Sequence, residues 1–441
     1  MLKQITIKEF DCIQCRIENK TNYIDIDTFN AIEKFVLENI ETIQYLKIAT
    51  KKGYGKVLQA QNYCGVIQTK DGTTIEILPK ITNVDSDEES KKILFKMLKT
   101  LKQSPFKNLN TANLKNAKLP LLEIFISMFL EELSKLIKSG LKSDYISKEE
   151  NLFFLKGKLK ISEQIKHNTI HKERFHVEYQ EFLSNRIENR LIKTTLEYLY
   201  KKSKSNKNQQ RIREFLFVFD EIDITHSFET DFQKVKLDRQ MKDYELVLLW
   251  CKTFLLDNSF SPYKGNDIAF ALLFDMNFLF ESYVYAYLKK AGNFNNITAQ
   301  DKKHHLAYLD GETSKFLLKP DIVIDDGLII ADTKWKLLSK DKNHQGVSQS
   351  DMYQLYAYGT KYTQCEDMYL IYPKDEEIEA NSYNYFKTTD QKKLHLNILF
   401  FDVQKNEFVK TELVNKKSYP LLKMIQPNTL SGEAHIKGVE K

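Results

Sequence analysis

Apolar and polar positions in the first 82 residues mostly follow the two-residue period of strands. Residues 4–17 alternate in this way and are expected to form one strand. Residues 28–41 carry apolar side chains at helical spacing instead. Residues 64–68 and 74–81 are two apolar runs joined by a turn that contains an Asp-Gly pair, which predicts a hairpin. This part of the chain should therefore be β-rich with one helix.

Helical spacing dominates residues 93–256. Four stretches have apolar positions every three or four residues and are predicted as helices, namely 93–101, 119–138, 189–202 and 243–256. Two polar stretches lie outside these helices. We expect residues 83–92 to be a charged linker and residues 201–210 to be an exposed connection.

Residues 258–267 contain Ser, Pro, Gly and Asn together and mark the expected boundary between 1–258 and 259–441. After it, residues 268–290 have the length and apolarity of a long helix, and residues 294–316 are irregular. Further along, the pattern predicts a helix over 349–361 and buried strands over 367–372 and 394–401. Residues beyond about 425 are expected to be a loose tail.

These patterns predict an α+β N-terminal half followed by an α/β domain with a mixed central sheet. The N-terminal half would consist of a β-rich region, 1–82, and a mainly helical region, 93–256. The strands and helices that alternate in the second half favour a sheet covered on both faces.

The most informative stretch is residues 318–336, LKPDIVIDDGLIIADTKWK. Two β-branched apolar runs flank an Asp-Gly pair, which is a strong short-range hairpin signal. Counting outward from this two-residue turn places Asp321 opposite Asp332, with their Cβ atoms about 5 Å apart. Lys334 lies two residues beyond Asp332, so it should point to the same face.

Two opposed carboxylates destabilise a sheet unless something offsets their repulsion. The expected cation is Mg²⁺, or Mn²⁺ in its place, because these ions bind one or two carboxylates together with waters and phosphate oxygens. A lysine beside such a site can activate the attacking water or neutralise charge on a phosphate. The set suits hydrolysis of a phosphodiester. The alternative is a surface hairpin whose Asp and Lys side chains are solvated.

Composition and charge exclude fewer classes of function than the hairpin over residues 318–336 does. The chain has 441 residues with a net charge of +6, which permits nucleic-acid binding without arguing for it. No apolar run reaches the roughly 18 residues of a membrane span, and the N-terminus lacks an apolar signal core, so we expect a cytoplasmic protein. Cys12 and Cys15 form a C-x-x-C pair without a second pair at zinc-site spacing, and we interpret it as incidental. No P-loop motif is present.

The residues PD followed by DTK resemble the PD-(D/E)xK nuclease motif. More narrowly, KPDIVI with ADTKWK, GVIQTKDGTTIEILPKI near the start and YISKEENLFFLKGKL in the middle are similar to the McrC family. McrC is the endonuclease subunit of the McrBC modification-dependent restriction system. The resemblance extends from the first strand to about residue 403, and it implies a PD-(D/E)xK endonuclease domain in the second half.

The resemblance also implies roles for single residues. Glu281 matches an acidic residue that often supplies a further metal ligand beside Asp321 and Asp332, although a helix-surface glutamate is the alternative. Gln354 and Tyr358 share one helix face and match a Q-x-x-x-Y pair thought to orient the nucleic acid or the site. The alternative is a helix that packs its tyrosines against the sheet.

Lys156 and Lys158 stand where the family has arginines. A basic loop there would contact a partner or phosphates, and a solvated loop is the alternative. A role that needs the bidentate fork of arginine is in doubt, since lysine supplies charge alone.

The resemblance implies a hexameric McrB-type AAA+ GTPase as partner. That partner would recognise and translocate modified double-stranded DNA, while this subunit cuts it and stimulates GTP hydrolysis through its N-terminal half. Two alternatives stay open, a non-catalytic NTPase activator or adaptor and a stand-alone RecB-like nuclease in DNA repair. The intact Asp321, Asp332 and Lys334 argue against the first, and the large N-terminal half argues against the second.

Overall fold

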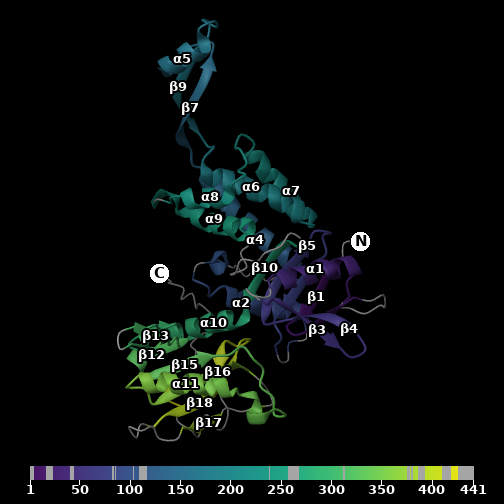
Figure 1. The fold of residues 1–441 in the computed structure, drawn as a ribbon, viewed down its shortest axis with the longest axis vertical. Helices are drawn as coiled ribbons and strands as arrows, with labels where there is room; N and C mark the ends of the chain where they lie inside the picture. Colours follow the sequence, from purple (N-terminus) through teal and green to yellow (C-terminus); the bar gives the residue numbers. More distant parts are fainter. Residues whose placement is uncertain are drawn as a thin grey trace, which may run out of the picture.

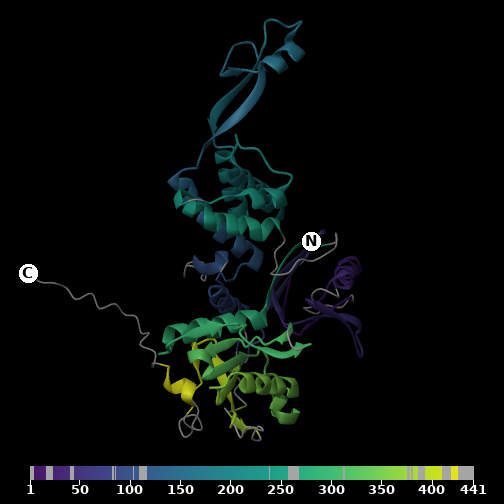
Figure 2. The same cartoon turned by 60° about the vertical axis from the view of Figure 1, so that its left-hand side comes forward.

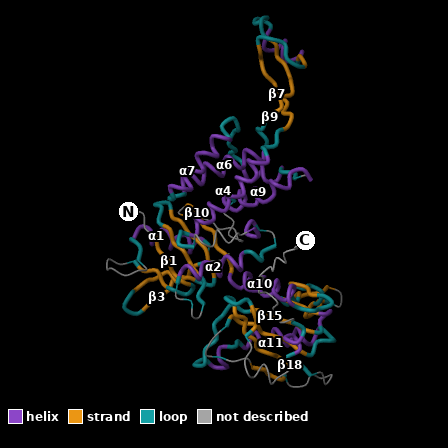
Figure 3. Tube along the Cα trace, turned by 180° about the vertical axis from the view of Figure 1, so that it is seen from behind, coloured by secondary structure: helices purple, strands orange, loops and turns teal. Residues whose placement is uncertain are grey.

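The computed structural model shows an elongated molecule, with a slender projection at one end and a sheet covered by helices at the other (Figure 1). The structure describes residues 4–15, 23–39, 44–81, 84, 86–102, 104–108, 117–237, 239–256, 268–310, 313–374, 378, 381–385, 393–409 and 419–425. A helical layer and an N-terminal β region lie between the two ends (Figures 1 and 3). Within the described ranges, no helix combines the length and apolarity that crossing a membrane requires.

The N-terminal β region contains a sheet of order β1-β6-β5-β10 and a smaller sheet of order β2-β4-β3. Its elements are β1 (Gln4–Lys8), β2 (Cys12–Gln14), α1 (Ile26–Glu38), β3 (Leu46–Lys51), β4 (Gly55–Ala60), β5 (Tyr63–Thr69), β6 (Thr74–Leu78) and β10 (Ile268–Asp275). The predicted hairpin is confirmed, since β5 and β6 pair antiparallel. Alternate side chains of β5 enter two cores, with Val66 facing the helical layer and Ile67 facing α1.

The single strand predicted over residues 4–17 is wrong. β1 ends at Lys8, and β2 begins at Cys12 in a different sheet. Phe10 adopts a positive φ of 65°, and the N–H of Lys8 donates to Asp11 Oδ2 over 3.0 Å. A turn therefore separates two strands, although apolar and polar residues alternate without a break across both of them in the sequence.

The helical layer confirms three predicted helices to within two residues at each end. Its elements are α2 (Asp87–Leu98), η1 (Pro105–Asn108), α4 (Leu121–Ser139), α6 (Ile187–Lys202), α7 (Asn206–Val218), α8 (Phe228–Lys234), η2 (Arg239–Met241) and α9 (Lys242–Leu255). The linker predicted over residues 83–92 is wrong in its second half. The side chain of Ser86 caps α2 by accepting from the N–H of Glu89 over 3.2 Å, and acidic side chains fill the first turn, where the helix dipole favours them.

The exposed connection predicted over residues 201–210 is also corrected, because α7 begins inside it. A buried carboxylate on α4, that of Glu123, accepts hydrogen bonds from Ser203 Oγ, the N–H of Ser205 and Asn208 Nδ2, over 2.8, 3.1 and 2.8 Å. These polar residues therefore bind a buried partner from a distant helix.

The projection consists of β7 (Asp144–Leu152), β8 (Lys158–Leu159), α5 (Ile161–Asn168) and β9 (Phe175–Leu183). Its sheet has the order β7-β9-β8. In Figures 1 and 2 it extends away from the helical layer, and its far end lies opposite the C-terminal sheet.

The second half is built on a mixed sheet of order β11-β14-β15-β16-β18-β17, with β19 paired to β18. Its elements are α10 (Met276–Ala291), β11 (Ile297–Ala299), β12 (His305–Leu309), β13 (Thr313–Leu317), β14 (Ile322–Ile324), η3 (Asp325–Gly327), β15 (Ile329–Thr333), η4 (Asn343–Gly346), α11 (Gln349–Lys361), β16 (Asp367–Pro373), β17 (Asn381–Asn384), β18 (His395–Asp402), β19 (Glu407–Phe408) and α13 (Pro420–Lys423). The strands predicted over 367–372 and 394–401 are confirmed as β16 and β18, and both run parallel to β15 in this mixed sheet.

Two cores cover the two faces of this sheet. Ala331 belongs to the core that contains α10 and the helical layer, and its neighbour Ile330 belongs to the core that contains α11. The sheet is thus buried on both faces, as its apolar strands indicate.

The helix predicted over residues 268–290 is wrong for its first eight residues. They form β10, which pairs antiparallel with β5, and α10 follows with Asp275 as N-cap. Alternate β10 side chains enter two different cores, and a run that is apolar on both sides shows no period that separates strand from helix. The predicted boundary, 258–267, lies outside the described residues, as does the predicted tail beyond 425. The irregular stretch predicted over 294–316 contains three strands.

Candidate active site

The hairpin β14–β15 forms in the predicted register. Ile322 pairs with Ala331 and Ile324 with Ile329. The turn residues Asp326 and Gly327 have φ angles of 55° and 101°, as a two-residue turn matched to the twist of its strands requires.

At the open end of the hairpin, Asp321 is hydrogen-bonded across to the other strand. Asp321 Oδ2 accepts from the backbone N–H of Thr333 over 2.7 Å and from its hydroxyl over 2.9 Å. Thr333 directly follows Asp332, so the two carboxylates are brought together at this edge.

Asp332 is 1% exposed. Lys334 Nζ lies 2.6 Å from Asp332 Oδ2 and 3.8 Å from Asp351 Oδ1. Apart from this ion pair, neither oxygen of Asp332 has a hydrogen-bond partner among the described residues. Lys334 Nζ also donates to Gln354 Oε1 over 3.3 Å, and Gln354 Nε2 donates to the hydroxyl of Tyr358 over 2.6 Å. The lysine is therefore held from both the sheet and α11.

Burial and repulsion by a neighbouring carboxylate raise the pKa of both aspartates. Burial is the larger cause, and the charge of Glu281 adds to it for Asp321, while the charge of Asp321 adds to it for Asp332. Burial alone would lower the pKa of Lys334, but the charge of Asp332 outweighs this and raises it above its usual range. The lysine is thus a stable cation beside two carboxylates that resist ionisation.

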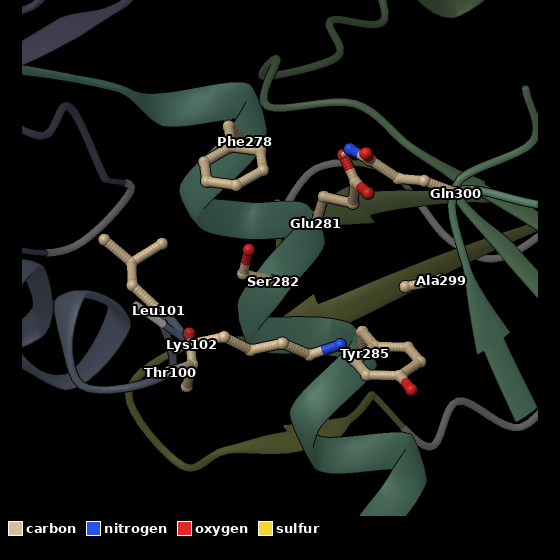
Figure 4. A pocket seen from close by; sticks show the side chains of 9 residues that line it. All are labelled: Thr100, Leu101, Lys102, Phe278, Glu281, Ser282, Tyr285, Ala299 and Gln300. Carbon is tan, nitrogen blue, oxygen red and sulfur yellow. Dashed lines mark hydrogen bonds between the residues drawn. The ribbon is translucent and has the colours of Figure 1, made fainter. Parts of the chain in front are cut away.

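Glu281 lies on α10 beside a cavity of about 390 Å³ (Figure 4). Glu281 Oε2 accepts from Gln300 Nε2 over 3.2 Å, and burial raises the pKa of Glu281. The opposite wall comes from the loop after α2, where Lys102 Nζ lies 5.3 Å from the ring centroid of Tyr285. The N-terminal half therefore contributes to the surroundings of this carboxylate.

The donor set suits a hard divalent cation. No three His, Cys, Asp or Glu side chains that could hold a metal ion are gathered in the described parts of the chain, and Glu281 bonds to Gln300 instead. Two carboxylates are nevertheless enough for Mg²⁺, which usually keeps several waters. Asp332 offers a buried oxygen, Oδ1, without a partner, and a bound cation would also relieve the repulsion between the aspartates. Asp321 and Asp332 therefore fit Mg²⁺ or Mn²⁺.

The structure brings the predicted residues Asp321, Asp332, Lys334, Gln354 and Tyr358 into one network. Tyr358 is 3% exposed, so its ring packs in the core while its hydroxyl faces Gln354. The ring of Tyr358 thus packs against the sheet, as one interpretation expects, and its hydroxyl lies at the candidate site, as the other expects.

Sequence reasoning missed Asp351 and Gln300. Asp351 lies three residues before Gln354, and this spacing places both on one helix face, which could have been noticed. Gln300 follows β11 in a stretch without a regular pattern, and no local signal points to it.

A further buried carboxylate contacts Trp335, the residue after Lys334. Glu9, which follows β1, accepts from Trp335 Nε1 over 2.8 Å and from the N–H of Lys80 over 3.0 Å. Glu9 is fully buried, and burial raises its pKa to about 8. The residue next to the site lysine is therefore tied to the N-terminal sheet.

Two solved structures are similar to this chain in fold. A chain of the refined half-complex from a tetradecameric assembly of Thermococcus gammatolerans McrB AAA+ hexamers with bound McrC matches with a TM-score of 0.63 and 19% identity, over 91% of this chain and 95% of that one. A chain of the cryo-EM structure of the T. gammatolerans McrBC complex matches with a TM-score of 0.47 and 21% identity, over 65% of this chain and 88% of that one. No curated protein matches.

The sequence itself matches the family described as McrBC 5-methylcytosine restriction system component, over residues 58–373. This range is more than half of the chain and includes both site aspartates and Lys334. The protein is therefore a member of the McrBC 5-methylcytosine restriction system component family, as its motifs indicated.

Proposed function

We propose that this chain is the metal-dependent DNA endonuclease subunit of an McrBC-type restriction system, with a PD-(D/E)xK site. The observation that carries the proposal is the buried Asp321–Asp332 pair with Lys334 Nζ 2.6 Å from Asp332. Repelling carboxylates in a core are costly unless they bind a cation or an acid–base partner. A pair of carboxylates that can bind a cation, next to a lysine, is suited to the hydrolysis of a phosphodiester bond.

Lys334 and Gln354 have different roles in the proposed reaction. Lys334 stays protonated because the pKa of its ammonium group is raised. It therefore suits the neutralisation of charge that develops on the phosphate better than the removal of a proton from water. Gln354 keeps the lysine in place. A Mg²⁺ ion held by Asp321 and Asp332 would supply an activated water and Lewis acidity.

The partner in this proposal is an McrB-type AAA+ GTPase hexamer that reads modified double-stranded DNA. The similar structure contains McrB AAA+ hexamers with bound McrC. In this chain, the projection is the part that suits such a docking role, because its large apolar side chains are exposed far from the sheet. They include Phe153, Phe154, Leu155, Ile165 and Ile170. Exposed apolar side chains grouped in this way indicate an interaction surface.

The test compares Asp332→Ala with wild type in two assays, in the presence of the AAA+ partner and GTP. We expect no DNA cleavage by Asp332→Ala and undiminished stimulation of GTP hydrolysis, because the projection and the site lie at opposite ends of the molecule. Lys334→Ala should behave in the same way, and exposed Asp341→Ala is the control. Wild-type cleavage should stop in EDTA and return with Mg²⁺ or Mn²⁺. Cleavage by Asp332→Ala at the wild-type rate would refute the site.

A further inference from the structure

Gln300 continues the hydrogen-bond ladder of the main sheet as far as a site aspartate. β11 pairs antiparallel with β14, with Ala299 opposite Ile322. One step further, the N–H of Gln300 donates to the carbonyl of Asp321 over 2.8 Å. The register of β14 with β15 places Asp332 opposite Asp321 on the other side. Asp321 therefore lies between Gln300 and Asp332 at the end of the sheet.

The two faces of this sheet contribute different groups to the site. Ile322 belongs to the core that contains α10, and Val323 belongs to the core that contains α11. Lys334 is contacted by Gln354 of α11, whereas Glu281 is part of α10. A contact at the end of the sheet is therefore needed to direct Glu281 toward the site aspartates.

Gln300 makes this contact from a backbone conformation that few residues of its type adopt. β11 ends at Ala299, and Gln300 has a φ of 50°, in the left-handed region that favours glycine and asparagine. Its side chain points toward Glu281, and Gln300 Nε2 donates to Glu281 Oε2 over 3.2 Å (Figure 4). Such conformations cost free energy and are concentrated at functional sites. The contact with Glu281 gives this one a role.

Glu281 is close enough to the aspartates for their charges to interact. Burial raises the pKa of Asp321, and the charge of Glu281 is the next cause. Burial likewise raises the pKa of Glu281, and the charge of Asp332 adds to it. Gln300 itself is neutral, so its hydrogen bond orients Glu281 without placing a positive charge on it. The carboxylate therefore keeps its attraction for a cation.

We propose that Gln300 is a positioning residue, which holds Glu281 within reach of Asp321 and Asp332 so that Glu281 joins them in binding a divalent cation. The proposal rests on the metal-dependent function proposed above and adds a residue that acts through Glu281. A hydrogen bond to a metal-binding side chain typically contributes a factor of about 10 to 100 in metal affinity. The effect of Gln300 on cation binding should therefore depend on Glu281.

The experiment measures Mn²⁺ binding by the full chain from the electron paramagnetic resonance signal of the free ion, with Asp332→Ala to identify binding at the site. Gln300→Asn keeps an amide and favours the left-handed backbone, but its side chain is one methylene shorter and loses Glu281. It should weaken Mn²⁺ binding about tenfold and preserve or raise the unfolding midpoint. Gln345 of η4, with a φ of 58°, is the matched control. Gln345→Asn should act alike on the midpoint and leave Mn²⁺ binding unchanged.

Two further variants test whether Gln300 acts through Glu281. Gln300→Gly, which also accepts the left-handed backbone, should weaken Mn²⁺ binding as Gln300→Asn does. Glu281→Gln should weaken it by a similar factor, and adding Gln300→Asn to this variant should cause no further loss. With the AAA+ partner and GTP, Gln300→Asn should need about tenfold more Mg²⁺ for half-maximal cleavage, with an unchanged KM for DNA.

Mn²⁺ binding by Gln300→Asn and Gln300→Gly as tight as that of wild type would overturn the positioning role while the nuclease proposal stands. Tighter binding would show that Gln300 holds Glu281 away from the cation, which also overturns it. So would a further loss in the double variant, because Gln300 would then act without Glu281. If wild type and Asp332→Ala bind Mn²⁺ equally, the aspartates hold no cation and both proposals fail.

Discussion

Asp321 and Asp332 occupy positions where a charged carboxylate is costly. Both have a raised pKa because burial withholds water and each aspartate also repels a neighbouring carboxylate. A group whose pKa is raised by folding destabilises the fold once the pH exceeds its ordinary, unfolded value. The site therefore lowers stability at neutral pH unless a cation binds.

Asp321→Asn should stabilise the metal-free protein at pH 7 by about 1 to 3 kcal/mol, because it removes a buried charge. The asparagine oxygen can still accept both hydrogen bonds from Thr333. The gain should vanish below about pH 4, where aspartate is protonated in the folded and unfolded states. Chemical denaturation in EDTA measures both values, with exposed Asp341→Asn as control.

Adding Mg²⁺ should then raise the unfolding midpoint of wild type and leave that of Asp321→Asn unchanged. Equal shifts for the two proteins would show that Mg²⁺ binds elsewhere.

At the scale of elements, β10 connects parts of the chain that the sequence pattern separates. It follows the predicted boundary, yet it pairs with β5 of the N-terminal sheet. Phe270, Leu272 and Phe274 fill the core shared with the helical layer, and Leu273 fills the core under α1. Burial of these four side chains contributes on the order of 10 kcal/mol, which is comparable with the whole stability of a domain.

A fragment of residues 1–258 should therefore fold poorly, while a fragment of residues 1–275, which retains β10 and ends before α10, should be soluble and bind the AAA+ partner. Without β10, β5 becomes an exposed apolar edge strand, which favours aggregation. Size-exclusion chromatography and circular dichroism of both fragments test this. A monomeric, cooperatively folded 1–258 fragment would show that β10 is dispensable.

At the scale of the whole molecule, the two halves meet at Glu9 and Trp335, which are 326 positions apart in the sequence. Glu9 directly follows β1 of the N-terminal sheet, and Trp335 is next to the site lysine. Burial raises the pKa of Glu9 from 4.5 to about 8. The stability that its protonated form provides is thus fully present below about pH 4.5 and is lost as the pH rises through about 8.

Glu9→Gln should remove this pH dependence, because glutamine keeps the acceptor for Trp335 and Lys80 without a charge. At pH 8 the variant should exceed wild type in unfolding free energy, by on the order of 4 kcal/mol. The two proteins should converge near pH 4.5. Denaturation between pH 4.5 and pH 8.5 measures the difference, with Glu88→Gln, at a partly exposed position in the first turn of α2, as control. Parallel curves for Glu9→Gln and wild type would contradict the prediction.

Local sequence by itself determined the hairpin that carries the site. The Asp-Gly turn and the period-two alternation set the register of β14 and β15, so Asp321, Asp332 and Lys334 could be placed together by counting. The spacing of Gln354 and Tyr358 likewise set their shared helix face. The long amphipathic helices and the parallel strands were predictable because their patterns extend over many residues.

Only the tertiary structure decided which long-range partners these elements have. An apolar run buried on both sides has no period, so β10 was indistinguishable from a helix until its pairing with β5 was seen. Polar stretches such as 201–210 became a helix start because Glu123, distant in sequence, binds them. Gln300 contacts Glu281, and Glu9 contacts Trp335. In both pairs, the sequence around one residue does not indicate which residue it will contact. Local patterns report backbone geometry and burial, whereas these contacts depend on how separate elements pack in three dimensions.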